Sequence, residues 1–293
     1  MNSLLQGIND WIKNILIDMI MRNLSDMMAL VNAQGVRLGT EVAMSPSVWN
    51  SSIWTMVQSV ATTVIVPIAG LVLVGAMTLE IIGWLNESNH MHSTGDVMAQ
   101  LFKLLLKIGL GAILVSKAMD ITMFIFDLSA YVIAKSMGIV TTNAAQLSVG
   151  LSGMRAIMMT SGVGELLGLA FTSLIGKIGM MVIGIAIRLV LAGRMIEIYI
   201  YCACGSAPYA TLTNKSLSGI GQNYIKNLLA LAFQGFFMLL MVGIYVALMQ
   251  STINSITAAN VEGMITEVLL ISITLVMMIL RSKSIAKSIF SAH

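Results

Sequence analysis

Two charged residues stand three positions apart inside a long apolar run. Arg194 and Glu197 belong to the segment RMIEIYIYCACG, and their spacing puts them on neighbouring positions of one helix turn. Ionisable groups inside a membrane helix are costly, so they pair with one another or face a protein interior or a water-filled cavity. We interpret the two residues as a self-satisfied polar patch that faces the protein interior. The functional alternative is a subunit contact or a pore lining.

A second set of charges lies in the apolar block of residues 97–140. A tight turn close to Lys117 would place Lys107 and Asp127, each ten residues from that turn, at similar depth in an antiparallel hairpin. Asp120 precedes Asp127 by seven residues and shares its helical face. The spacing predicts a structural Lys107–Asp127 ion pair, with a proton or ion relay as the alternative. Further charges within or at the ends of apolar runs are Glu80, Lys177 and Glu267.

The remaining residues that could carry chemistry form weak patterns. A polar loop holds Glu87, His90, His92 and Asp96. We interpret it as a solvated loop rather than a metal site. Cys202 and Cys204 are the only cysteines, and they lack the further nearby thiols or imidazoles of a zinc site. The sequence contains no metalloprotease, P-loop, nucleophile-elbow or dinucleotide motif. We therefore expect a protein that is not an enzyme and that uses no cofactor or metal.

Composition indicates the class of protein that positions these residues. The 293 residues are 57% hydrophobic and only 10% charged, whereas a soluble domain carries about 25% charged residues. The formal net charge of +3 is too small to indicate nucleic acid as a direct ligand. An all-α, polytopic transmembrane helix bundle is the fold class that fits.

The N-terminal region differs from the rest of the chain. Residues 1–22 show a helical apolar face opposite a polar one. The apolar face consists of Leu4, Leu5, Ile8, Ile12, Ile15 and Met19. We expect this amphipathic helix to lie in the membrane interface or against a partner, or to be an ordinary packed helix. A connector is predicted over residues 23–50, so residues 1–50 form an N-terminal region before a transmembrane domain over residues 51–293.

The first membrane span is predicted over residues 52–85. Trp54 and Trp84 stand at its ends, and tryptophan favours the two membrane interfaces. Thirty helical residues between them cover roughly 45 Å, the thickness of a bilayer with its headgroups. Pro67 and Gly70 lie inside this span and predict a kink.

The later apolar blocks set the number of spans. The block at residues 97–140 is long enough for two helices, and the block at residues 164–210 is either two spans or one long bent helix. Residues 228–249 contain no charge and would cover roughly 30 Å as a helix. A last span is predicted over residues 264–280. Six spans fit best, with five or seven as alternatives.

The basic residues predict an orientation. The tail at residues 281–293 has three basic residues and no acidic one, so we expect it in the cytoplasm. The loop at residues 211–227 carries Lys215 and Lys226 without an acid and is expected on the same side. The loops without Lys or Arg, expected outside, are residues 86–96 and 250–262. This scheme places both termini inside and requires an even number of spans.

Several segments, in order, carry a family resemblance. They read LLQGINDWIKNILIDMIM, VIVPIAG, DITMFIFD, RMIEIYIY, APYATLTNK, NYIKNLLALAFQGFF and KSIAKSIFSAH. With them the chain resembles the TrbL-like conjugal transfer proteins of Gram-positive bacteria. These are relatives of the sixth VirB protein, the polytopic inner-membrane channel component of type IV secretion systems. The resemblance covers nearly the whole chain and is densest over residues 194–237.

The resemblance implies a function and partners. It implies a channel or scaffold subunit that helps to move relaxase-bound single-stranded DNA across the cytoplasmic membrane. Expected partners are a secretion ATPase, small membrane subunits, a bitopic scaffold protein and further copies of this chain. A basic lining of the DNA path is expected from Lys103, Lys107, Lys117, Lys177 and Arg188. Lys215 and Lys226 are expected in a cytoplasmic docking loop. The alternative function is a secondary transporter or exporter of small solutes.

Overall fold

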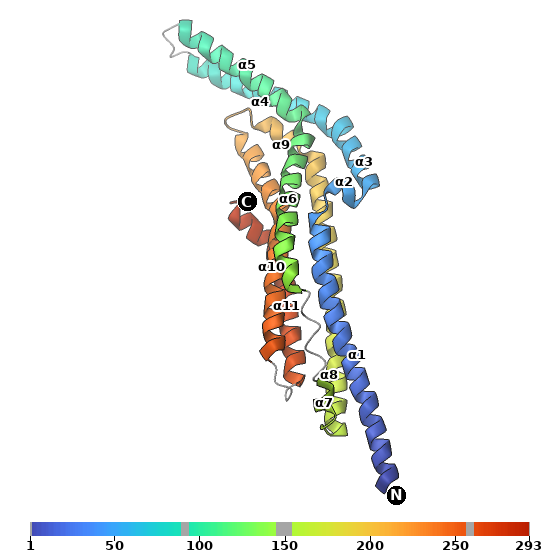
Figure 1. Cartoon of the computed structure of the whole chain (residues 1–293). Coiled ribbons are helices and arrows are strands. Elements are labelled where there is room, and N and C mark those ends of the chain that lie inside the picture. Colours follow the sequence, from blue (N-terminus) through green and yellow to red (C-terminus); the bar gives the residue numbers. More distant parts are fainter. Residues whose placement is uncertain (1, 89–93, 145–153, 256–260, 293) are drawn as a thin grey trace. The chain divides into compact units, whose positions relative to one another are not determined.

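Helices make up nearly all of the computed structural model, which describes residues 2–88, 94–144, 154–255 and 261–292 (Figure 1). These residues contain no strand, so the all-α prediction is confirmed. The helices are α1 (Asn2–Ala43), α2 (Pro46–Trp49), α3 (Ser51–Val60), α4 (Val66–Ser88), α5 (Thr94–Ser116), α6 (Ala118–Ala144), α7 (Met154–Met158), α8 (Val163–Cys204), α9 (Ser206–Thr211), α10 (Ser218–Ser255) and α11 (Val261–Ile289).

Six stretches of the described residues are long and apolar enough to cross a membrane, as predicted. They are Ser51–Asn86, Val97–Ser116, Ala118–Gly138, Val163–Cys204, Ser218–Ser251 and Ile265–Ile289. The block predicted over residues 164–210 is one long helix, α8, followed by the short α9. Of the six stretches, the one in α10 is the most buried inside the protein and the one in α5 the least. The chain is therefore a multi-pass membrane protein in which α5 needs lipid or another protein to cover its apolar side chains.

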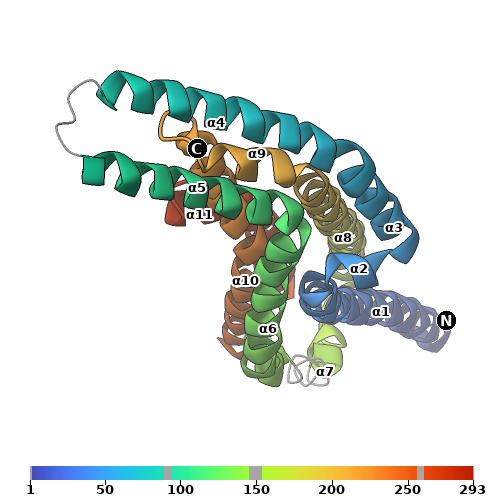
Figure 2. The ribbon, with the colours of Figure 1, turned by 90° about the horizontal axis from the view of Figure 1, so that it is seen from above.

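A π-helical turn at Ala61–Ile65 joins α3 to α4 in the first span. The Val66 N–H donates to the Ala61 carbonyl, five residues back. Pro67 follows directly and has no N–H for a regular helical hydrogen bond, so one widened turn accommodates it. Figures 1 and 2 show the chain bending between α3 and α4. The predicted kink is confirmed, and it lies before Pro67 rather than near Gly70.

The helices divide into two compact units. The first unit comprises residues 1–43, 132–192 and 236–282, and the second comprises residues 44–131, 193–235 and 283–293. Four long helices, α6, α8, α10 and α11, contribute residues to both units. The second unit holds the first residues of α6 and α10 and the last residues of α8 and α11, so these four helices alternate in direction between the units.

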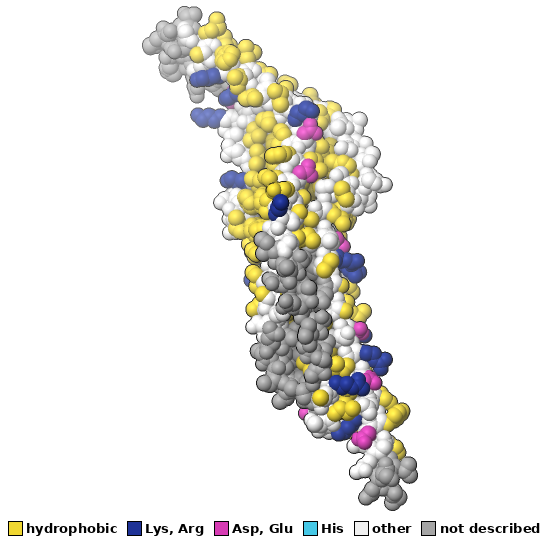
Figure 3. Space-filling model, in the orientation of Figure 1, with side chains coloured by type: hydrophobic (Ala, Val, Ile, Leu, Met, Phe, Trp, Pro, Cys, Tyr) yellow, Lys and Arg dark blue, Asp and Glu magenta, His cyan; other side chains and the backbone are white. Residues whose placement is uncertain are grey.

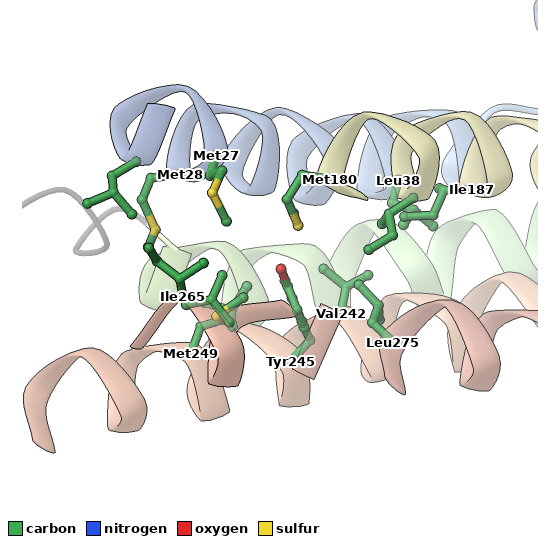
Figure 4. Packing of buried hydrophobic residues seen from close by; sticks show 14 of the residues in the cluster. Met27, Met28, Leu38, Met180, Ile187, Val242, Tyr245, Met249, Ile265 and Leu275 are labelled. Carbon is green, nitrogen blue, oxygen red and sulfur yellow. The ribbon is translucent and has the colours of Figure 1, made fainter. Parts of the chain in front are cut away.

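Side chains from α1, α6, α7, α8, α10 and α11 form the core of the first unit. Met27 of α1, Met180 of α8, Tyr245 of α10 and Leu275 of α11 are buried in one apolar cluster, and Figure 4 shows them facing one another. Polar contacts inside this core are satisfied. The Asn23 amide donates to the Ser173 hydroxyl at 3.1 Å. The hydroxyl groups of Tyr245 and Ser272 are 3.0 Å apart.

Helix α1 departs from its predicted pattern. It continues through Ala43, so most of the predicted connector over residues 23–50 is helical. Its buried apolar residues include Leu16, Ile17, Ile20, Leu24, Met27, Met28, Leu38 and Val42. Ile8, Ile15 and Met19, which were predicted on the apolar face, are exposed. From Leu16 onward α1 is therefore an ordinary packed helix, and its buried face is offset from the one predicted.

The second unit combines a helical core with a hairpin. Phe126, Ile198 and Leu228 are buried where α6, α8 and α10 meet. The hydroxyl of Tyr199 on α8 donates to the Pro46 carbonyl at 2.8 Å, which ties α8 to α2. Helices α4 and α5 run back along each other, and α9 lies beside both (Figures 1 and 2).

Candidate functional site

Glu80 on α4 is the acceptor at which α4, α5 and the loop before α10 meet. One carboxylate oxygen accepts from the Lys107 ammonium group. The other accepts from the Asn214 side-chain amide at 3.1 Å and from the Lys215 backbone N–H at 3.2 Å. The Glu80 side chain is only 17% exposed, so these partners replace most of its water. We call Glu80, Lys107, Asn214 and Lys215 the Glu80 junction.

Asn214 shapes the loop that joins this junction. Its side-chain oxygen accepts from the N–H groups of Ser216 at 2.9 Å and Leu217 at 3.1 Å. Its amide also donates to the Ala76 carbonyl at 3.1 Å. An asparagine that bonds the backbone just after itself stabilises a turn. Asn214 therefore sets the loop conformation, directs the chain into α10 and attaches the loop to α4.

The predicted Lys107–Asp127 ion pair is wrong, because Lys107 binds Glu80 instead. The chain does turn at Lys117, between α5 and α6, as expected. However, α5 folds back along α4 and not along α6 (Figures 1 and 2). Asp120 lies beside that turn and pairs with Lys117 at 3.1 Å.

The predicted pairing of Arg194 with Glu197 is also wrong. Arg194 is buried, and its Nη2 donates to the Ala232 carbonyl of α10 at 3.2 Å, while its Nε has no partner among the described residues. Glu197 instead pairs with Lys283 of α11 at 2.6 Å. Residues three apart on a helix point about 60° apart, enough for one to face the core and the other the surface. The two residues connect α8 to two different helices.

The Glu197–Lys283 pair is expected to behave as an exposed ion pair. The side chains are 27% and 49% exposed, so solvent screens the attraction. We expect Glu197→Lys or Lys283→Glu alone to lower the free energy of unfolding by about 0.5–1 kcal/mol. The double exchange should restore most of it. Thermal unfolding of the purified protein in mild detergent measures this, with Arg281→Glu in place of Lys283→Glu as the matched control. A double exchange that is no better than the control would contradict the pairing.

The other predicted basic residues fall into different places. Lys103, Lys107 and Lys215 line one cavity of about 610 Å³. Sequence reasoning had assigned Lys103 and Lys107 to a DNA path and Lys215 to a docking loop. Lys177 pairs with Asp26 of α1 at 2.6 Å, and Arg188 is exposed on α8.

The predicted docking loop is shorter than expected. Helix α10 begins at Ser218, so the loop of residues 211–227 ends after Leu217. Lys226 therefore lies on α10, where it is exposed, and not in the loop. Lys215 and Lys226, which the sequence placed in one loop, therefore lie on a loop and on a helix of the second unit.

An aromatic corner where α8, α9 and α10 meet escaped sequence-based prediction. The Tyr224 hydroxyl donates to the Tyr201 carbonyl at 2.7 Å, and the rings of Tyr209 and Tyr224 meet edge to face with centroids 5.4 Å apart. Tyr209 lies outside the six candidate spans, and burial raises the pKa of its hydroxyl above the ordinary value. Gly205 and Gly221 border this corner, and the clustering of Tyr and Gly over residues 201–224 was the available signal.

The described residues contain no group of three His, Cys, Asp or Glu side chains that could hold a metal ion. The loop with Glu87, His90, His92 and Asp96 is outside the residues whose side chains the structure describes. Cys202 is buried, Cys204 is exposed, and neither forms a disulfide. The arrangement joins helices through polar contacts and presents a basic cavity.

Comparison with known proteins adds one match. The family model of TrbL/VirB6 plasmid conjugal transfer like proteins matches residues 31–206, more than half of the chain. No curated protein and no solved structure matches it. The matched residues include Glu80, Lys107 and Glu197 and end before the loop that carries Asn214.

Proposed function

Because the chain belongs to the TrbL/VirB6 plasmid conjugal transfer like family, we propose that it is a non-enzymatic channel or scaffold subunit of a conjugative type IV secretion system. In this role it helps to move relaxase-bound single-stranded DNA across the cytoplasmic membrane of a Gram-positive bacterium. The observation that carries the proposal is the family match, which extends over the first four of the six candidate spans. Membership makes the chain a multi-pass membrane component of a conjugal transfer machine.

Its exposed apolar surface supports assembly with other subunits. Large apolar side chains are exposed along α4, α5 and α8, among them Leu71, Phe102 and Leu189. Lipid covers some of them, and further copies of this chain or the small membrane subunits and the bitopic scaffold protein cover others. Lys226, exposed near the start of α10, is the contact that we propose for the secretion ATPase.

We propose a cytoplasmic location for the loop with Lys215 and for the basic tail, because both carry basic residues without an acid. The second unit contains this loop and residues 283–293 of the tail. Two further parts of the predicted orientation do not fit this grouping. Residues 1–43, expected on the same side, belong to the first unit. The loop at residues 86–96, expected outside, begins six residues after Glu80, which binds Asn214 and Lys215.

Two basic residues on α8 support a DNA path. Lys177 and Arg188 are eleven residues apart, about three helical turns, so they lie on one face roughly 16 Å apart along the axis. Arg188 is exposed and the Lys177 side chain is 32% exposed. In an oligomer Arg188 is repeated in every copy and forms a ring of positive charge, as in anion-conducting pores. Lys177 adds to this ring when a strand phosphate replaces its partner Asp26.

We expect Lys177→Gln with Arg188→Gln to lower crosslinking of the transferred strand to this subunit by about tenfold, since each charge at contact distance is worth about 1 kcal/mol in water. Formaldehyde crosslinking during mating, followed by immunoprecipitation and quantitative PCR of the strand, measures the effect. The matched control is Lys13→Gln with Arg22→Gln, which removes the same charge from α1 of the same unit. Equal crosslinking in the two double variants at equal protein level would contradict the path.

Co-purification in mild detergent tests the assignment to the machine. We expect the tagged chain to elute in a large complex that contains the secretion ATPase. A small complex that lacks the ATPase and shows saturable solute uptake in vesicles would overturn the proposal in favour of a secondary transporter.

A further inference from the structure

The cavity at the Glu80 junction carries an excess of positive charge. Its charged lining is Glu80 from α4, Lys103 and Lys107 from α5, and Lys215 from the loop. Three ammonium groups therefore face a single carboxylate. That carboxylate already accepts from Lys107, from the Asn214 amide and from the Lys215 backbone N–H. One carboxylate balances only one of the three ammonium charges, so an excess of positive charge remains for something that enters the cavity.

Three donors in this cavity lack an acceptor. Lys103 and Lys215 take part in none of the ion pairs that link described residues, and both are exposed. The Trp84 indole nitrogen lines the same cavity, is buried, and has no hydrogen-bond partner among the described residues. An indole N–H and two ammonium groups are donors only. The complementary ligand is an anion with several oxygen acceptors, such as a phosphate group.

The surroundings of the cavity are apolar and uncovered. Leu79 of α4 and Leu104 of α5 line the cavity, and Leu79 is 50% exposed. Phe102 and Leu105 do not line it but lie on the same stretch of α5, and each is 66% exposed. Figure 3 shows hydrophobic side chains at the surface of this end of the second unit, with basic side chains between them. A free phosphate or a DNA backbone gains nothing from exposed apolar side chains beside the cavity, whereas the acyl chains of a lipid bury them. These apolar side chains favour a phosphate group that is attached to hydrocarbon.

We propose that this cavity binds the phosphate headgroup of an anionic phospholipid. Lys103 and Lys215 pair with the phosphate, the Trp84 N–H donates to a headgroup oxygen, and the acyl chains lie along α4 and α5. Basic pockets between membrane helices are a known way to hold anionic headgroups, and a tryptophan at that depth is in its favoured environment. The bound lipid joins the hairpin of α4 and α5 to the loop before α10, at the same place as the Glu80 junction. The proposal concerns the chain alone and does not depend on the transport of DNA.

Native mass spectrometry of the full chain tests the lipid site. The protein is reconstituted into nanodiscs of phosphatidylcholine and phosphatidylglycerol in equal parts, released in mild detergent, and examined for retained phosphatidylglycerol. We expect Lys103→Gln with Lys215→Gln to lower retention by about tenfold or more, because each lysine near an anionic headgroup contributes about 1 kcal/mol. Lys226→Gln with Arg281→Gln removes the same charge from other exposed positions of α10 and α11 and should leave retention unchanged.

Two results would overturn the proposal. One is equal retention of phosphatidylglycerol by wild type and by the cavity variant, with unfolding curves showing that both are folded. The other is displacement of phosphatidylglycerol from the wild type by inorganic phosphate or by a single-stranded oligonucleotide, which would show a general phosphate site. Retention that resists both competitors and is lost only in the cavity variant supports the lipid.

Discussion

Replacing Gly221 with alanine is expected to lower the free energy of unfolding by about 1–3 kcal/mol or more. A Cβ atom at this position of α10 would stand 2.5 Å from Leu212 Cγ and 2.7 Å from the Pro208 carbonyl oxygen. A side chain can rotate away, but the Pro208 carbonyl belongs to the backbone of α9. Relief would therefore require α10 to move away from α9 and from the loop of the Glu80 junction.

Gly219→Ala is the matched control for this substitution. Gly219 lies two residues earlier on α10, and a Cβ there would meet nothing within 4 Å. Alanine is the better helix former, so the control should be neutral or slightly stabilising. Thermal unfolding in detergent and the amount of protein in the membrane measure both variants. If Gly221→Ala and Gly219→Ala behave alike, the close packing of α9 on α10 is not as described.

Removing the Glu80 carboxylate is expected to have an effect of similar size. Glu80→Ala leaves the Lys107 ammonium, the Asn214 amide and the Lys215 N–H without their shared acceptor. Hydrogen bonds to a charged group contribute about 1.5–3 kcal/mol each. Water reaches the 43%-exposed Lys107 side chain and compensates for part of the loss. We expect a net loss of about 2–3 kcal/mol and a loop that is released from α4.

Loop release gives a readout separate from stability. In a Cys202→Ala, Cys204→Ala background, Ser216→Cys should react faster with a soluble maleimide when Glu80 is alanine than when it is intact. Glu267→Ala is the control, because Glu267 is an exposed glutamate on α11, far along the chain from the junction. Equal reaction rates in the Glu80 and Glu267 variants would show that the junction does not hold the loop.

The lengths of the apolar runs predicted the number of membrane-spanning helices. They did not predict which helices contact one another. Six spans, the kink at Pro67 and the turn at Lys117 depend on local composition and backbone chemistry. The start of α10 was missed because Gly219, Gly221 and polar residues weaken helix propensity there. Its contact with α9 stabilises that first turn, and such contacts between distant segments are not visible in a local pattern.

The errors in the candidate site have one physical origin. Lys107 is separated from Asp127 and from Glu80 by similar numbers of residues. Which of the two it binds depends on whether α5 folds back along α6 or along α4. Arg194 and Glu197 were close enough to pair within α8, but partners from α10 and α11 were better placed. A charged side chain in an apolar region pairs with whichever group the helix packing brings close to it. The sequence therefore shows which charged residues need a partner more reliably than it shows which residue the partner is.

Contact between the transferred strand and the wild-type chain is the most direct test of the central claim. Donor cells are fixed with formaldehyde during mating, this subunit is immunoprecipitated, and the transferred strand is quantified. We predict recovery of that strand that depends on an active relaxase and secretion ATPase and exceeds recovery of a non-transferred plasmid segment. Recovery no greater than that of the non-transferred segment, with the subunit present and transfer proceeding, would contradict a place in the DNA path.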